Sequence, residues 1–257
     1  MCEIFGVSSK ERIQVNEYLK AFYEHSSQHP HGWGLACLEG DEAFIEKEPI
    51  QATKSHYLKE RLTNPIKIKN LMAHIRYATI GNVEYTNCHP YTKKDQNGRR
   101  WTQVHNGTIF DYSPLNKYLN IQSGSTDSER ILLHLVDQVD RRERLEERKL
   151  SAKERFDLFD SIFIKMSKGN KLNIIFYDGE MMYVHTNYKQ SLHYLFKDNS
   201  IIFSTTPLTK EEWEPLPMNT LFAYKDGKRV FKGTNHGNEY IDSEENMKFL
   251  YQIFSNL

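Results

Sequence analysis

Hydrophobic and polar positions follow two periodicities along this 257-residue chain. Short apolar runs bounded by turn residues predict strands, and apolar positions three or four apart predict helices. Strands are predicted at 2–7, 33–38, 42–48, 69–78, 101–105, 172–177, 181–185, 200–205 and 219–224. Helices are predicted at 14–25, 54–62, 126–140 and 244–254, and a further apolar helical stripe runs from 156 to 166 before Gly169.

The turn residues support this division of the chain. Asp178-Gly179 and Asp226-Gly227 have the composition of hairpin turns, and the polar stretch 93–100 is predicted to be a loop or hairpin tip. Strands, then helices, then more strands favour an α+β fold with two mainly antiparallel, helix-covered sheets over a doubly wound parallel sheet. No repeat, linker or domain boundary is apparent, so residues 1–257 are predicted to form a single domain.

The central helical region has a clear start. Thr126 fits the N-cap position, and Glu129, three residues later, is predicted to complete a capping box. The stretch 141–155 is dominated by mixed charges. It is therefore predicted to be a solvated helix face or an exposed connection.

Composition narrows the class of protein. Lysine plus arginine number 34, as do aspartate plus glutamate, so no net charge favours nucleic acid or an anionic membrane as a partner. No apolar run has the length of a signal peptide or a membrane span. Cys2, Cys37 and Cys88 are too few for a disulfide framework. These features predict a cytoplasmic protein in a reducing compartment.

Cys2 is the first candidate for chemistry. Removal of Met1 would leave a thiol and a free α-amine on one residue. A thiol reacts as its thiolate and needs a base, and an α-amine with an ordinary pKa of about 7.7–8 can act as that base. By itself, a cysteine at this position is more often a small buried residue that starts a strand.

Four other residues each allow a structural and a functional interpretation. Arg76 lies in an apolar strand pattern, where it could form a structural ion pair or bind a substrate carboxylate. Asn106 and Gly107 could form a turn, or an oxyanion hole from the side-chain amide and the backbone N–H. Asp127 could stabilise a helix N-terminus or bind a substrate ammonium.

The segment 87–91 is predicted to be a structural turn near these residues, with His89 held extended by Pro90. Several histidines and the three cysteines offer the ligand types that metals prefer. No CxxC or HExxH spacing is present, however, so neither a metal site nor a cofactor is predicted.

Taken together, these segments match one family in order and approximate spacing. The chain resembles the class II glutamine amidotransferases, which are N-terminal-nucleophile hydrolases, and in particular their stand-alone YafJ-type branch. The matching segments are MCEIFG at the start, HGWGLA at 31–36, AHIRYAT at 73–79, NCHPY at 87–91, VHNGTI at 104–109, STDSE at 125–129 and FSTTPLTKEEWEPLP at 203–217. The resemblance covers nearly the whole chain.

The resemblance implies an αββα four-layer sandwich with the nucleophile at the end of a central strand. It implies that Cys2, once Met1 is removed, attacks the γ-amide carbon of glutamine to form a thioester, with its own amine as the base. By the same resemblance Asn106 and Gly107 stabilise the oxyanion.

The resemblance also supplies the substrate-binding residues. Arg76 would bind the α-carboxylate, with Thr79 beside it, and Asp127 would bind the α-ammonium. Tyr77 and His89 would be supporting residues. A zwitterionic amino acid needs one cation and one anion for recognition, so this set is electrostatically consistent.

The chain departs from the family pattern in several places. Glu3 stands where many members have glycine, Ile80 replaces a histidine, and Tyr77 replaces a tryptophan; the last two changes concern the loop that closes over substrate. No synthase domain is predicted within the 257 residues. The ammonia acceptor would then be a separate synthase subunit, or the enzyme hydrolyses glutamine or another γ-glutamyl compound without transfer. A non-catalytic glutamine-binding regulator is a further alternative.

Overall fold

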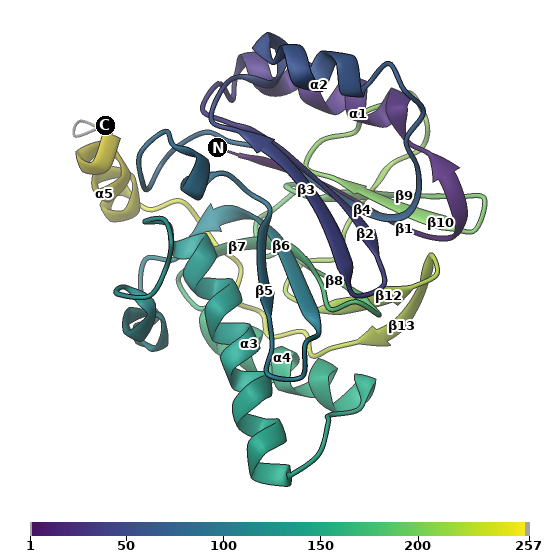
Figure 1. The fold of residues 1–257 in the computed structure, drawn as a ribbon. Coiled ribbons are helices and arrows are strands. Elements are labelled where there is room, and N and C mark those ends of the chain that lie inside the picture. Colours follow the sequence, from purple (N-terminus) through teal and green to yellow (C-terminus); the bar gives the residue numbers. More distant parts are fainter. Residues whose placement is uncertain (1, 255–257) are drawn as a thin grey trace.

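Two antiparallel sheets lie face to face, and helices cover both outer faces, in the computed structural model of the protein, which describes residues 2–254 (Figure 1). This is the predicted αββα sandwich. Every strand pairing in the two sheets is antiparallel. Among the described residues, no helix is both long enough and apolar enough to cross a bilayer.

The first sheet has seven strands in the order β11-β9-β10-β1-β4-β2-β3. Its strands are β1 (Glu3–Gln14), β2 (Trp33–Glu39), β3 (Glu42–Glu48), β4 (Lys67–Ile75), β9 (His193–Lys197), β10 (Ser200–Ser204) and β11 (Glu214–Pro215). The helices α1 (Asn16–Glu24) and α2 (His56–Arg61) cover its outer face, at the top of Figure 1.

The second sheet has six strands in the order β13-β12-β8-β7-β6-β5. Its strands are β5 (Tyr91–Lys94), β6 (Arg100–Thr108), β7 (Lys171–Tyr177), β8 (Met182–His185), β12 (Phe222–Lys225) and β13 (Lys228–Lys232). The long helices α3 (Asp127–Glu146) and α4 (Ala152–Met166) cover its outer face, and α5 (Glu244–Phe254) lies at the end of the sandwich where the chain begins (Figure 1).

The alternation of side chains along each strand builds three apolar layers. On β1, Ile4 faces the second sheet, whereas Phe5 and Val7 face α1, because successive residues of a strand point to opposite faces. On β7, Ile175 packs between the sheets and Phe176 packs against the helices. Fully burying one such side chain contributes about 1.5–3 kcal/mol, so the strand pattern fixes both the layers and the register.

Most predicted elements are confirmed, with three differences of extent. β1 runs to Gln14, because an irregularity after Ser8 lets it continue along β4. The sequence pattern had placed Arg76 within a strand, but β4 ends at Ile75, so Arg76 lies just after the strand. β6 continues through Asn106 and Gly107, so this pair does not form a turn.

Several edge strands were not predicted. β9, β11 and β13 lie at or next to sheet edges, and their residues are largely exposed, so they lack a clear apolar alternation. β5 begins just before the predicted loop 93–100 and is paired with β6 by four residues. Edge strands carry weaker patterns because only part of each strand is buried.

The N-terminus of α3 is confirmed, but its capping box is not. The Thr126 hydroxyl accepts a hydrogen bond from the Glu129 N–H at 3.2 Å, as predicted. The Glu129 carboxylate, however, accepts from the N–H groups of Ser123 and Gly124 at 2.7 and 2.8 Å instead of from Thr126. It therefore orders the loop before the helix.

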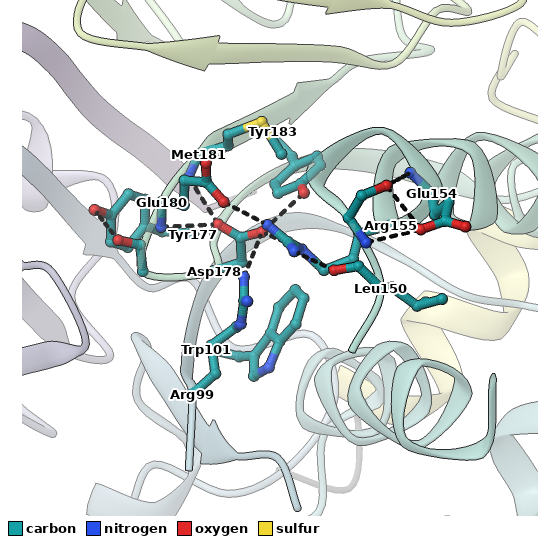
Figure 2. Close-up of polar contacts among 12 residues, drawn as sticks. Arg99, Trp101, Leu150, Glu154, Arg155, Tyr177, Asp178, Glu180, Met181 and Tyr183 are labelled. Carbon is teal, nitrogen blue, oxygen red and sulfur yellow. Dashed lines mark hydrogen bonds and ion pairs between the residues drawn. The ribbon is translucent and has the colours of Figure 1, made fainter. Parts of the chain in front are cut away.

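Most of the charged stretch 141–155 is exposed, as expected from the sequence, but Arg155 is a buried exception. Arg155 is 2% exposed and donates from Nε to Asp178 at 2.9 Å and from Nη2 to Glu180 at 2.8 Å (Figure 2). Asp178 also accepts from the Tyr183 hydroxyl at 2.9 Å. This network connects α4 to the β7–β8 turn, and Arg99 of β6's leading loop lies 3.6 Å from Asp178.

We expect Asp178→Asn to lower the free energy of unfolding by about 3 kcal/mol, because it leaves the buried Arg155 with only the partly exposed Glu180 as an anionic partner. Asp157→Asn is the matched control, since its ion pair with Lys153 is more than half exposed and should contribute less than about 1 kcal/mol. Urea titration of both variants measures the difference. Equal losses would show that the buried network does not stabilise the fold.

Candidate active site

A cavity of about 370 Å³ opens at the end of the sandwich where β1 starts. One part of its wall comes from the strand ends and the loop after β4: Cys2, Tyr77, Thr79, Asn106, Gly107 and Thr108. The remaining part comes from Phe110, Lys171 and the C-terminal segment, with Tyr240, Asp242, Met247 and Leu250. Five of the predicted site residues thus share one cavity.

Pairing of β1 with β4 positions Cys2. Glu3 lies opposite Ile75 in the antiparallel register, which brings Cys2 beside Tyr77. The Tyr77 N–H donates to Cys2 Sγ at 3.3 Å, and the thiol is 3.3 Å from the Tyr77 carbonyl oxygen, to which it can donate. The sulfur is therefore held against the backbone that follows β4.

The electrostatic setting of Cys2 keeps the thiol protonated. Burial raises the pKa of the Cys2 thiol, and this effect outweighs the hydrogen bond from the Tyr77 backbone and the nearby charge of Arg76, which lower it. A thiol with a raised pKa does not ionise at neutral pH without help. Reaction at this sulfur would therefore require a base close to it.

Asn106 and Gly107 lie in the cavity wall because β6 pairs closely with β7. Asn106 is opposite Asn173, whose side-chain amide donates to the Asn106 carbonyl at 2.9 Å. Gly107 is opposite Leu172, and a Cβ at this position would overlap the carbonyl oxygen of Lys171. Glycine is required here by the close approach of two backbones.

Arg76 and Asp127 are buried next to the cavity but are not part of its lining. The Arg76 guanidinium donates to the carbonyl oxygens of Ile80, Gly81 and Asn82 at 2.8–3.0 Å, so it holds the loop after Thr79. These three bonds use three of its five N–H donors.

Asp127, at the first turn of α3, accepts from the N–H groups of Ile109 and Ser128 at 2.7 and 2.9 Å. It thus connects the end of β6 to the start of the helix. Asp127 raises the pKa of the Cys2 thiol and Arg76 lowers it, so both charges act on the sulfur.

His89 belongs to a buried cluster behind the cavity. Its ring stacks on that of His74 with 4.0 Å between centroids, and its Nδ1 accepts from the His105 N–H at 3.2 Å. Burial holds the pKa of His74, His89 and His105 below the usual range for histidine, so all three are neutral at pH 7. His89 therefore packs beneath the site and does not contact the cavity.

Glu3, one of the residues that depart from the family pattern, has two histidine partners. Its carboxylate lies 2.9 Å from Nδ1 of His25 and 3.3 Å from Nε2 of His29. Burial would raise the pKa of Glu3, but the hydrogen bonds from His29 and His25 outweigh it and leave the pKa lowered. The His29 ring also packs edge-on against Tyr77, so this cluster supports the backbone that holds Cys2.

The cavity residues after β6, on β7 and in the C-terminal segment carry no motif in the sequence and were not predicted. Tyr240 stacks on Phe110 with 5.9 Å between ring centroids, and Phe249 of α5 packs edge-on against the same ring. Lys171 begins an apolar strand, which gave no signal of a site. Asp242 lies far from the other site residues in sequence, so only the fold brings it to the cavity.

Potential metal ligands do not gather at this cavity. Within residues 2–254, no group of three or more histidine, cysteine, aspartate or glutamate side chains has the arrangement of a metal site.

The fold is that of the N-terminal-nucleophile hydrolases. The model of the family "Glutamine amidotransferases class-II" matches residues 1–200, which is more than half of the chain. The chain therefore belongs to the class II glutamine amidotransferases.

Relatives cover most of the sequence. An uncharacterized protein of Methanocaldococcus jannaschii, MJ1515, is 28% identical over 258 residues, which are 90% of this chain and 71% of that protein. The Escherichia coli (strain K12) protein YafJ is 29% identical over 192 residues, covering 73% of this chain and 74% of YafJ. The similarity to YafJ agrees with the branch indicated by the sequence motifs.

Solved structures share the fold at low sequence identity. A predicted glutamine amidotransferase from Pseudomonas aeruginosa PA01 superposes with a TM-score of 0.64 at 20% identity and covers 90% of this chain and 100% of its own. The glutamine phosphoribosylpyrophosphate amidotransferase of Bacillus subtilis has a TM-score of 0.64 at 17% identity, over 91% of this chain and 49% of its own.

We expect Gly107→Ala to lower the free energy of unfolding by about 3 kcal/mol or more, because β6 and β7 must separate to admit the new methyl group. Gly6→Ala is the matched strand-glycine control. Its Cβ would meet the movable Cδ1 of Ile175 at 2.9 Å, so we expect a loss of about 1 kcal/mol. Denaturant unfolding compares the two, and similar losses would contradict the close backbone approach.

Proposed function

We propose that this protein hydrolyses the γ-amide of glutamine or of another γ-glutamyl compound through a thioester on Cys2. The observation that carries the proposal is the meeting of Cys2 with Asn106 and Gly107 in one cavity. A nucleophile and two neutral hydrogen-bond donors are the groups that acyl transfer requires.

In the proposed reaction, Met1 is removed and the α-amine of Cys2 takes the thiol proton. Met1 lies outside the described residues. Sγ attacks the γ-carbonyl carbon, and the resulting oxyanion accepts hydrogen bonds from the Asn106 side chain and the Gly107 N–H. The C–N bond then breaks, and the amine returns the proton to the departing nitrogen. Water cleaves the thioester, releasing glutamate and the free thiol.

Recognition of the glutamyl group is proposed for the charged residues behind the cavity. Arg76 retains N–H donors beyond those given to the 80–82 carbonyls, and these would bind the α-carboxylate beside Thr79. Asp127 would accept a hydrogen bond from the α-ammonium. Tyr77 and His89 would support this arrangement, Tyr77 through its backbone contact with the sulfur and His89 by packing beneath it.

The fate of the leaving nitrogen depends on partners. Ammonia would pass to a separate synthase subunit, or be released. The Bacillus subtilis amidophosphoribosyltransferase is 27% identical over 140 residues, which are only 28% of its length. Most of that protein therefore has no counterpart in the matched region.

We expect Cys2→Ala to reduce glutamate release from glutamine by at least about 10⁴-fold while the unfolding midpoint stays close to that of the wild type. A glutamine-like diazo-ketone should add one label per wild-type chain at Cys2 and none to the variant. Intact-mass measurement of the same sample should show that Met1 is absent. Binding of glutamine without labelling or turnover would instead indicate a regulatory subunit.

We expect Asp127→Asn to raise KM for glutamine by about 10–100-fold, because it removes a charge-assisted hydrogen bond to the α-ammonium. Asparagine keeps one oxygen that can accept from the Ile109 N–H and loses the bond from the Ser128 N–H, so the unfolding midpoint of the variant is measured alongside its kinetics. N-acetylglutamine, which lacks the ammonium, is the comparison substrate. A variant that still discriminates against it as sharply as the wild type would rule out this role.

A further inference from the structure

We propose that His31 is a positioning residue for the Cys2 sulfur, because its imidazole holds the peptide group against which the thiol lies. His31 opens the segment HGWGLA at 31–36, and the proposed reaction gives this histidine no role. It is not among the residues that line the cavity, so it would act through the backbone and not on the substrate. This inference rests on the proposed reaction at Cys2 and adds a residue to it.

One peptide group lies between the imidazole and the thiol. Its N–H, that of Ala78, donates to His31 Nδ1 at 2.9 Å. Its carbonyl oxygen, that of Tyr77, lies 3.3 Å from Cys2 Sγ, which can donate to it. A peptide group is planar, so its N–H and its carbonyl turn as one unit. The hydrogen bond at the imidazole therefore fixes the direction of the carbonyl that the sulfur contacts.

Backbone pairing fixes His31 itself. The His31 N–H donates to the Arg76 carbonyl at 3.0 Å, and the Arg76 N–H donates to the Gly32 carbonyl at 2.8 Å. These two bonds continue the antiparallel pairing of β2 with β4 beyond the start of β2 and the end of β4. The His31 ring also packs on the Tyr77 ring, with 5.2 Å between their centroids. The imidazole is thus a fixed point from which the neighbouring peptide group is held.

The Ala78 N–H depends on this imidazole. Ala78 is 2% exposed, and the contacts of residues 2–254 give its N–H no acceptor other than His31. A buried N–H without an acceptor is costly, so the peptide group would rotate toward another partner if the imidazole were removed. That rotation would move the Tyr77 carbonyl and displace the sulfur relative to Asn106 and Gly107.

The same bond sets the protonation state of the imidazole. A ring nitrogen that accepts a hydrogen bond carries no proton, so the proton of neutral His31 lies on Nε2. Burial lowers the pKa of His31, and the nearby positive charge of Arg76 lowers it further. A lowered pKa favours the neutral form of a histidine at pH 7, which is the form that can accept from Ala78.

Two substitutions at this one site separate the hydrogen bond from the bulk of the side chain. In His31→Asn, Oδ1 takes the place of Nδ1 and can accept from the Ala78 N–H, whereas His31→Leu has no acceptor. We expect His31→Leu to lower kcat for glutamate release from glutamine by about 10–100-fold, since a small displacement of a reacting atom has an effect of this size.

The asparagine variant is the matched control, and its kcat should stay within about threefold of the wild type. KM should change by less than about threefold in both variants, because the Arg76 guanidinium still holds the carbonyls of residues 80–82. Both variants are assayed well below their unfolding midpoints, so that a lower kcat reflects the geometry of folded protein.

Equal kcat values in the two variants would overturn the positioning role, as would a loss confined to KM. In either case Cys2-dependent glutamate release by the wild type would still support hydrolysis. A wild type that releases no glutamate would overturn both proposals.

Nuclear magnetic resonance of the wild type tests the hydrogen bond without any substrate. The protein is labelled with ¹⁵N-histidine, and the His31 signals are those absent from His31→Asn. At pH 7 we expect a proton on Nε2 and none on Nδ1. A proton on Nδ1 would contradict the proposal, even if the leucine variant failed to fold.

Discussion

The antiparallel pairing of β1 with β4 is the constraint on which the site depends. It places the first residue before β1 against the backbone that follows β4, so the sulfur of Cys2 lies 3.3 Å from the Tyr77 N–H. A shift of one residue in this register would turn Ile4 away from the space between the sheets. The free energy of core burial therefore also fixes the position of the thiol.

The second sheet brings the other half of the site to the same end of the sandwich. Because β1 packs over β6 and β7, Asn106 and Lys171 reach the cavity from neighbouring strands. The close β6–β7 approach at Gly107 leaves no room for a side chain. At the opposite end of β7, Arg155 on α4 donates a hydrogen bond to Asp178 in the β7–β8 turn. This buried pair connects α4 to the second sheet, which also carries Asn106 and Gly107.

Burial has opposite consequences for the groups around the cavity. It raises the pKa of the Cys2 thiol and lowers that of Lys171, since in both cases the charged form is disfavoured. It keeps His74, His89 and His105 neutral. The lowered pKa values make these imidazoles weak bases, and none of the three lines the Cys2 cavity, so this histidine cluster does not supply the base that the thiol needs. This is consistent with the proposed role for the α-amine of a processed Cys2.

The sequence by itself determined most strands and helices, because local alternation and turn chemistry are encoded in neighbouring residues. Its motifs showed the resemblance to the family, and that resemblance implied the four layers. The sequence also identified Cys2, Asn106 and Gly107 as a group through their motifs. It could not show that Arg155 is buried, since a run of charges looks the same whether or not one member has a distant partner such as Asp178. Only the tertiary structure brought Lys171 and the C-terminal segment to the cavity, because contacts between residues far apart in sequence depend on how the two sheets stack.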